Sequence, residues 1–416
     1  EDKGNTWEVI SPDLTTDNPD KQNQAESGGL TIDATQAENH CTILCISPNP
    51  QRSGEIWVGT DDGRLQHTQD GGATWVDHAL EIKRFPLGAW IPQIHVSAHD
   101  PDEVYVVVND YRRNNWQPYL YRTNDGGETW VRLVMDGGEV TGHCLSVAQD
   151  PVASSLLFLG TEEGLFVSFD RGTNWNRWTK DIPSVPVRDM VIHPRDGDLI
   201  LGTFGRAAYI IDDLAPLRAL AKDGNAMFDR TLGVFEIADA YQVNYRRPLG
   251  ARFTADHDWE GENRRSGARI QYFVHPDSAE VYGKDKLLWA VLDAQGDTIR
   301  NGGIDAEGGL QSMWWRFDAN GMPWPGREIQ KKQKFPSGGG PEVLPGEYRI
   351  AMSMGEHSSN ASFEVKSDPR VPFDAAAHQQ RSTHRRLVLQ EVEPIVEAMD
   401  QIQRALATID VVKQEM

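Results

Sequence analysis

One short pattern recurs in the first half of the chain and limits what that half can fold into. The pattern is Ser/Thr-x-Asp-x-Gly-x-x-Trp. Its aspartate can accept backbone N–H groups within a tight turn, its glycine can adopt a positive φ, and its tryptophan can bury a large ring between sheets. We call it the aspartate turn and interpret it as structural. Its residues are Thr68, Asp70, Gly72 and Trp75; Thr123, Asp125, Gly127 and Trp130; Ser168, Asp170, Gly172 and Trp175; and, in a shortened copy, Asp2 and Trp7.

Each aspartate turn lies in similar surroundings. A β-rich run such as Glu55 to Thr60 precedes it, followed by an acidic Gly turn and a second run that leads into the pattern. A further strand lies upstream, so each unit contains four strands. Four strands in roughly 40–50 residues are typical of a β-propeller blade. We therefore predict about four blades over residues 1–214, the last of them atypical because Asp212 is followed by neither Gly nor Trp at the expected spacing.

The second half of the chain has no such repeat. Residues 215–232 read as a connector, and about seven short strands over residues 233–368 predict a β-sandwich of immunoglobulin type. Residues 373–416 are helical in composition, and Pro394 is expected to start or kink a helix there. An apolar seam needs a partner, whether the sandwich, a later helix or another chain. Its members are Ile395, Met399, Ile402, Leu406 and Ile409.

Composition excludes several classes of function. The chain has 416 residues and a net charge of −21, which would repel a phosphate backbone, so nucleic acid is not an expected partner. No apolar run approaches the roughly 18 residues of a membrane-spanning helix. Its three cysteines are too few for a disulfide framework. We expect buried free thiols, with a Cys41–Cys144 bond as the alternative.

Several phrases resemble a known family. They include Trp57-Val58-Gly59-Thr60-Asp61-Asp62-Gly63, Val185-Pro186-Val187-Arg188-Asp189 and, in the second half, Pro345-Gly346-Glu347-Tyr348. The chain resembles the Asp-box (BNR-repeat) propellers of sialidases, xyloglucanases and sortilins, and most of all large bacterial sortilin-like proteins labelled glycosyl hydrolases. Phe204 departs from the histidine of that family's Gly-Thr-His-Gly-Arg phrase.

This resemblance implies that the chain is the C-terminal portion of a longer protein with more blades upstream. It also implies a secreted, periplasmic or outer-surface location. About four blades are too few to close a typical ring, so we expect the exposed blade edges to pair with the missing upstream blades, in the same or a separate polypeptide.

Propeller sites commonly use the innermost strands and the loops at one end of the channel. The sequence offers candidate ligand-binding residues there and two weaker catalytic candidates, Asp189 and Glu38. His40-Cys41 and His143-Cys144 occupy similar places in their blades, but they lack the short ligand pairs of zinc sites, so we expect no metal and no cofactor. The binding candidates are His40, Trp90, Gln93, His143, Arg188 and Arg206.

Two functions fit these features. The first is a binding or structural module in a larger assembly, without catalysis, that recognises a protein or a glycan. The second is a glycoside hydrolase acting on a polysaccharide in the propeller channel or a cleft, which would require two carboxyl groups about 5–10 Å apart. We favour the first, because the resemblance covers phrases typical of the fold and does not include a catalytic pair of carboxylates.

Overall fold

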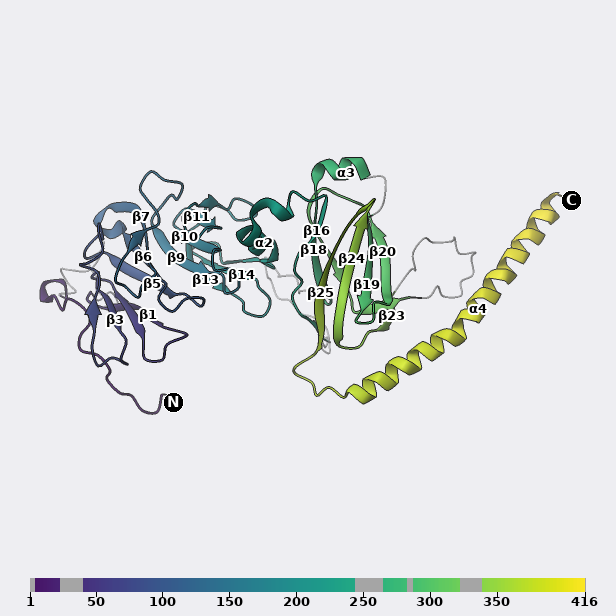
Figure 1. Ribbon diagram of the computed structural model, residues 1–416, viewed down its shortest axis with the longest axis horizontal. Coiled ribbons are helices and arrows are strands. Elements are labelled where there is room, and N and C mark those ends of the chain that lie inside the picture. Colours follow the sequence, from purple (N-terminus) through teal and green to yellow (C-terminus); the bar gives the residue numbers. More distant parts are fainter. Residues whose placement is uncertain (1–3, 23–39, 244–264, 283–286, 322–338, 416) are drawn as a thin grey trace. The chain divides into compact units, whose positions relative to one another are not determined.

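The computed structural model describes residues 4–22, 40–243, 265–282, 287–321 and 339–415. The fold is mainly β, with one long helix at the C-terminal end (Figure 1). Internal contacts divide the chain into two units, and the division falls between Gly224 and Asn225, inside the predicted connector. The two units are described separately below.

The first unit contains four antiparallel sheets, each formed by strands that are consecutive in the sequence. Short 3-10 helices lie at η1 (Pro19–Lys21) and η2 (Tyr111–Arg113). The sheets are β1 (Ile43–Pro48), β2 (Ile56–Thr60), β3 (Leu65–Thr68) and β4 (Val76–Asp77); β5 (Trp90–Val96), β6 (Val104–Asp110), β7 (Asn115–Thr123) and β8 (Val131–Arg132); β9 (Cys144–Gln149), β10 (Leu157–Thr161), β11 (Gly164–Ser168) and β12 (Asn176–Arg177); and β13 (Val187–Ile192), β14 (Leu199–Thr203) and β15 (Ala208–Ile211).

The aspartate turn joins the third and fourth strands of each complete sheet. In the first, Asp70 Oδ1 accepts the Thr74 N–H at 2.9 Å, and Thr68 Oγ1 accepts the Gly72 N–H at 3.0 Å. The Trp75 indole N–H then donates to the Gly72 carbonyl at 3.0 Å. The other two full copies repeat these bonds, so the local sequence determines the turn.

The shortened copy keeps only part of this geometry. Asp2 lies outside the described residues, while the Trp7 indole donates to the Gly4 carbonyl at 3.1 Å, as in the full copies. Trp7 is 91% exposed, whereas Trp175 is 5% exposed. The expectation of a ring buried between sheets is therefore wrong for Trp7. Its turn forms locally, but burial of the ring requires a neighbouring sheet.

The four sheets pack as consecutive blades of a partial propeller. The innermost strands contact one another in the order β1, β5, β9, β13. One apolar core joins the first and second blades through Trp57 and Ile91, and another joins the second and third through Tyr105 and Val147. A third core joins the last two blades, and helix α2 (Ala215–Asp223) packs Leu217 against it. The prediction of about four blades with an atypical last one is confirmed.

The second unit consists of two main sheets around a shared core, which Trp315 and Ile350 help to fill. Three strands form the order β16-β18-β21, five form β17-β25-β24-β19-β20, and β22 pairs with β23. The immunoglobulin type of this sandwich stays a prediction. The elements are η3 (Gly224–Met227), β16 (Leu232–Val234), β17 (Ala240–Gln242), β18 (Ala268–Val274), α3 (Pro276–Tyr282), β19 (Leu287–Asp293), β20 (Thr298–Ile304), β21 (Gly309–Trp315), β22 (Asp318–Asn320), β23 (Gly339–Glu342), β24 (Gly346–Met354) and β25 (His357–Ser367).

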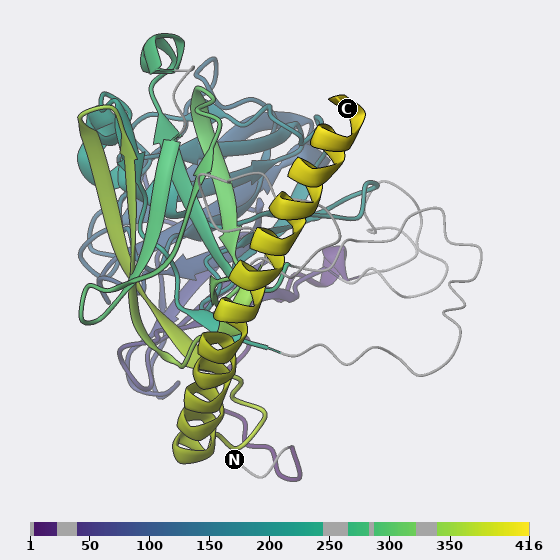
Figure 2. The same cartoon turned by 90° about the vertical axis from the view of Figure 1, so that its right-hand side faces the viewer.

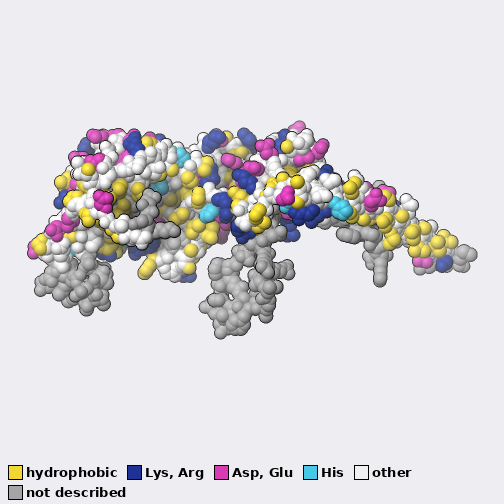
Figure 3. Space-filling view, turned by 90° about the horizontal axis from the view of Figure 1, so that it is seen from below, with side chains coloured by type: hydrophobic (Ala, Val, Ile, Leu, Met, Phe, Trp, Pro, Cys, Tyr) yellow, Lys and Arg dark blue, Asp and Glu magenta, His cyan; other side chains and the backbone are white. Residues whose placement is uncertain are grey.

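The chain continues into one long helix, α4 (Ala375–Glu415), shown in Figure 2. Pro394 lies inside this helix, so the idea that a helix begins there is wrong. The predicted apolar seam is exposed, for example Ile402 at 58% and Leu406 at 56%, and hydrophobic side chains are visible along the helix in Figure 3. None of the helices in the described part of the chain is both long and apolar enough to cross a membrane.

Candidate functional site

The starts of the innermost strands and the turns between second and third strands meet at one end of the blades. In the first blade the Asp61 N–H donates to the Thr42 carbonyl at 3.0 Å. In the third blade the Glu162 N–H donates to the His143 carbonyl at 3.1 Å, and in the last the Phe204 N–H donates to Pro186 at 2.9 Å. In three blades, the same type of bond therefore joins the start of the innermost strand to the turn after the second strand. We call this end of the blades the loop face.

These bonds correct one prediction about equivalence. Thr42, not His40, occupies the position of His143, because each carbonyl accepts the N–H of the first acidic turn residue. The two His-Cys pairs are therefore offset by two residues and have different surroundings. Cys144 is fully buried in β9, whereas Cys41 is only partly buried, and all three cysteines are free thiols. The sequence alone does not show at which residue each innermost strand begins, so this offset of the His-Cys pairs could not be predicted from it.

His143 is the centre of a packed group of side chains on the loop face. It is 4% exposed, and its ring stacks on Tyr111 with centroids 4.7 Å apart. The Trp116 ring meets it edge-on at 5.8 Å, and Glu162 Oε2 lies 3.0 Å from His143 Nδ1. The group joins the second blade to the third. We call it the aromatic cluster, and its members are Trp90, Tyr111, Arg112, Trp116, His143 and Glu162.

Arg112 links the two sides of the aromatic cluster. Its Cζ atom lies 3.1 Å from the centre of the Trp90 ring and 4.8 Å from that of Tyr111. A guanidinium held over aromatic faces is attracted by the ring quadrupole, by about 0.5–2 kcal/mol per contact. Trp116 is 51% exposed, and its indole donates to Asn114 Oδ1 at 3.0 Å. The cluster therefore presents an oriented indole to solvent above a rigid base.

Burial controls the charge of the central imidazole. It lowers the pKa of His143, because the charged form would lose its hydration, while the Glu162 carboxylate acts in the opposite direction. The positive charges of Arg188 and Arg112 lower this pKa further. His143 is therefore a neutral ring at neutral pH, and it serves as an aromatic surface rather than a cation.

Two of the predicted binding residues, Trp90 and His143, belong to this cluster. Arg188 lies close enough for its charge to act on His143, and its guanidinium lies 5.5 Å from the Phe204 ring. Arg206 is exposed in the turn of the last blade.

The other predicted residues lie elsewhere. The Gln93 side chain accepts the Val147 N–H at 2.6 Å, so it joins two blades. His40 lies beside Cys41 in the first blade. Asp189 is exposed and accepts the N–H of Met190 at 2.8 Å, while Glu38 lies outside the described residues.

Three cluster residues, Tyr111, Arg112 and Trp116, were absent from the sequence prediction. Tyr111 and Arg112 lie between β6 and β7, where the first and third blades have only a short acidic turn, and Trp116 lies near the start of β7. Asn114 takes a left-handed conformation there with φ of 61° and turns the chain back into β7. The longer connection, rich in aromatic and basic residues, is a signal that could have identified the site.

The acidic turn of the first blade has a structural role. Asp61 accepts hydrogen bonds from the Thr42 backbone and hydroxyl at 2.8 and 2.9 Å. Burial raises the pKa of Asp62, but hydrogen bonds from Thr60 and Thr16 outweigh it, and the pKa lies below its usual value. A glycosidase acid needs the opposite shift, because it must hold a proton near neutral pH.

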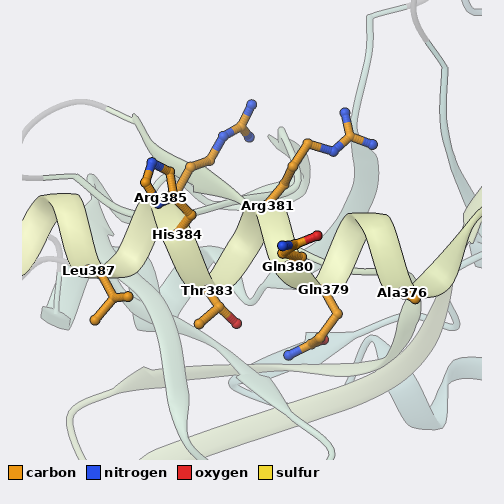
Figure 4. A pocket seen from close by; sticks show the side chains of 8 residues that line it. All are labelled: Ala376, Gln379, Gln380, Arg381, Thr383, His384, Arg385 and Leu387. Carbon is orange, nitrogen blue, oxygen red and sulfur yellow. The ribbon is translucent and has the colours of Figure 1, made fainter.

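A shallow hollow runs along the first turns of α4, and Figure 4 shows its lining residues, which include Arg381, His384 and Leu387. The lining residues in the described part of the chain all come from α4. Side chains on one helix do not converge on a ligand from several directions, so these residues alone do not form a binding site comparable to the aromatic cluster.

No family model matches the chain. It is 27% identical over 145 residues to an oligoxyloglucan-reducing end-specific xyloglucanase of Emericella nidulans, a match that covers 33% of this chain and 17% of the relative. It is 30% identical over 119 residues to vacuolar protein sorting/targeting protein 10 of Aspergillus clavatus, covering 25% of this chain and 8% of the relative. The chain thus spans less than a fifth of these curated relatives. Among solved structures it resembles a GH74 xyloglucanase from Xanthomonas campestris, with a TM-score of 0.35, 16% identity, and coverage of 65% of this chain and 45% of the other.

Proposed function

We propose that this chain is a non-catalytic binding module of a larger secreted or cell-envelope assembly, and that it recognises a protein or glycan ligand through the aromatic cluster. The observation that carries the proposal is the exposed Trp116 indole above the stacked rings of Tyr111 and His143. Aromatic side chains of this kind bury much surface with little loss of conformational entropy. A neutral imidazole beneath them avoids the desolvation cost of a buried cation.

The arrangement of carboxylates supports binding over hydrolysis. Glu162 lies against His143, and Glu163 Oε2 accepts the Thr141 hydroxyl at 2.6 Å. Asp61 and Asp62 are occupied by the hydrogen bonds described above. Each of these acids has a structural partner, and the one with a lowered pKa, Asp62, favours the ionised form.

A polysaccharide assay separates the two candidate functions. Because one relative is named a xyloglucanase, xyloglucan is the first probe, followed by a glycan array and a library of peptides. We expect retention of the chain on a ligand without release of new reducing ends. Xyloglucan hydrolysis that survives Trp116→Ala but is lost in Asp189→Asn would contradict the proposal and support a glycoside hydrolase.

Variants locate the binding surface. Replacing Trp116 by Ala removes the exposed indole, and we expect about a tenfold or greater loss of affinity, the size common for an aromatic anchor. Trp7→Ala is the matched control, because Trp7 is 91% exposed and belongs to a different turn. Equal losses in both variants would exclude the aromatic cluster as the binding site.

We also propose that the open side of the last blade is covered by a further blade. In the first three blades, the residue that follows the bulge of the innermost strand bonds to the next blade. Cys45 donates to the Ile91 carbonyl at 3.3 Å, Gln93 accepts from Val147 at 2.6 Å, and Ser146 donates to Val187 at 3.0 Å. Asp189 holds this position in the last blade and is exposed.

The glycines paired with these positions also support a further blade beside the last one. A Cβ on Gly59 would lie 2.5 Å from Ile91 Cγ2, and one on Gly160 would lie 2.5 Å from the Val187 carbonyl oxygen. Gly202 is their equivalent, yet the nearest atoms to its Cβ position, on Asp189, are 3.7 Å away. The same open face carries an apolar row of paired residues: Val191, Ile200 and Ile210. Val191 is 55% exposed and Ile210 is 60% exposed, as expected of a blade face whose neighbour is another polypeptide segment.

A further inference from the structure

Three chemically different ligand groups meet in the first blade at the loop face. His40, Cys41 and Asp62 each offer one nitrogen, sulfur or oxygen atom, and these atoms lie within 4.8 Å of one another. Asp62 is 5% exposed, and the other two side chains are partly buried. Imidazole, thiolate and carboxylate are the three ligand types that zinc takes in proteins.

The distances suit a tetrahedral ion. His40 Nδ1 lies 3.4 Å from Cys41 Sγ. With Zn–N near 2.0–2.1 Å and Zn–S near 2.3 Å, a tetrahedral angle separates the two ligand atoms by about 3.5 Å. The pair is therefore already spaced as two ligands of one zinc ion would be.

The backbone explains how adjacent residues can face the same point. Neighbouring side chains of a strand normally point to opposite sides. Cys41 has a φ of 61°, a left-handed conformation that is costly for a residue other than glycine, asparagine or aspartate. This turn breaks the alternation just before β1 begins. Strain of this kind often accompanies a functional site.

Other groups orient two of the ligands. The Asn18 N–H lies 3.4 Å from Cys41 Sγ, and the Thr16 hydroxyl lies 3.5 Å from it. The Thr16 N–H donates to Asp62 Oδ2 at 2.6 Å, and the Thr60 hydroxyl donates to Oδ1. Each carboxylate oxygen has a second lone pair that remains for a metal. Outer hydrogen bonds of this kind hold ligands in place in zinc sites.

We propose that His40, Cys41 and Asp62 bind one Zn²⁺ ion, with water as the fourth ligand. A thiolate and a carboxylate bring two negative charges, which match the charge of the ion, and the imidazole binds as a neutral ring. The proposal is independent of ligand binding at the aromatic cluster. It replaces the expectation of no metal site that the residue spacing suggested.

Cobalt is a direct probe, because a cysteine ligand gives Co²⁺ a thiolate charge-transfer band in the near ultraviolet. The full chain, freed of metal with a chelator, is titrated with Co²⁺ and then with Zn²⁺ as competitor. We expect one equivalent of Co²⁺ to bind with this band and with visible absorption of tetrahedral intensity, and Zn²⁺ to displace it. A wild-type chain without the band would overturn the proposal.

Matched cysteine variants identify the ligand. Cys41→Ser is expected to lose the band, while Cys45→Ser keeps it, since burial raises the pKa of Cys45 to about 12 and holds that thiol protonated. Asp62→Asn should weaken binding by about tenfold or more, because even outer-sphere changes cost that much. Thermal unfolding in chelator checks that each variant folds. A band that persists in Cys41→Ser and disappears in Cys45→Ser also refutes the site.

Discussion

At the scale of single residues, the aspartate turns hold much of the local order of the blades. Hydrogen bonds from the Thr74 backbone and hydroxyl lower the pKa of Asp70 to about 2. The equivalent hydrogen bonds from Thr129 lower the pKa of Asp125, and the Thr129 hydroxyl contributes most. Their stabilising effect is complete above about pH 4 and disappears as the pH falls toward 2, because the native carboxylate must then take up a proton. These turns therefore contribute fully to stability at neutral pH.

The second glycine of the turn is needed for two reasons. Gly127 has a φ of 101°, and a Cβ there would lie 2.7 Å from the His78 ring and 3.0 Å from Trp57. Gly126 has a φ of 67°, and its nearest neighbour would be Asp102 Oδ1 at 3.4 Å. We expect Gly126→Ala to cost about 1–2 kcal/mol from backbone strain, and Gly127→Ala to cost more because rings must also move. Urea denaturation measures both, and equal losses would contradict the packing argument.

A buried histidine makes stability depend on pH. Burial lowers the pKa of His95 to about 4, with Glu103 acting in the opposite direction. As the pH falls below about 6.5, the unfolded chain binds a proton at this residue before the native chain does. The free energy of unfolding should therefore fall between about pH 6.5 and pH 4, and fall less steeply in His95→Gln. Denaturation curves of both proteins across this pH range test the prediction. If the free energy of unfolding depends on pH equally in the wild type and in His95→Gln, His95 does not cause the loss of stability.

At the scale of elements, α4 leaves its apolar seam exposed to solvent. Its seam repeats at intervals of four and three, which is the pattern of a coiled coil, and Ile395 is 56% exposed. An isolated helix gains little stability from its own hydrogen bonds in water. The exposed seam therefore supports the prediction that another helix packs on α4.

Charge placed in the seam should disrupt that packing. If the partner is a second copy, the wild-type chain associates with rising concentration, and Ile402→Glu abolishes the association. Gln401→Glu adds the same charge at an exposed position outside the seam and should have no effect. Sedimentation equilibrium reports both results. A wild-type chain that stays monomeric would rule out pairing of two copies through α4.

At the scale of the whole molecule, the repeated contact between blades determines whether a strand glycine can be replaced by a residue with a side chain. Gly160 lies where the next blade crosses it closely, and a Cβ added there would lie only 2.5 Å from the Val187 carbonyl oxygen of that blade. Gly202 lies at the equivalent position on an open face. The same residue type is therefore required in one blade and sterically free in the other.

Alanine at these two positions should give opposite results. We expect Gly160→Ala to cost about 1–3 kcal/mol through overpacking, and Gly202→Ala to leave this chain unchanged or stabilise it by up to about 1 kcal/mol. In a longer form that supplies an adjoining blade, Gly202→Ala should become destabilising. Thermal unfolding of both forms measures this, and a Gly202→Ala variant that is tolerated in both would argue against a neighbouring blade.

Much of the architecture could be predicted from the sequence because it is local. The bonds of Asp125 and Thr123 lie within one turn, and the alternating strands and acidic turns follow from neighbouring residues. Part of the site could also be predicted from the sequence, since Trp90 and His143 lie at the starts of innermost strands. Tyr111 and Arg112 were missed because their contacts depend on how two blades approach each other.

The aspartate turns, the blade repeat and the helical tail can be predicted from local sequence, since each depends on hydrogen bonds or periodicity within a short segment. Which side chains meet depends on how the blades pack in the folded chain. The fold paired Thr42, not His40, with the position of His143, because a shift of two residues in strand register changes every contact. It also brought His40 and Cys41 beside Asp62, through a left-handed residue that no periodicity reveals.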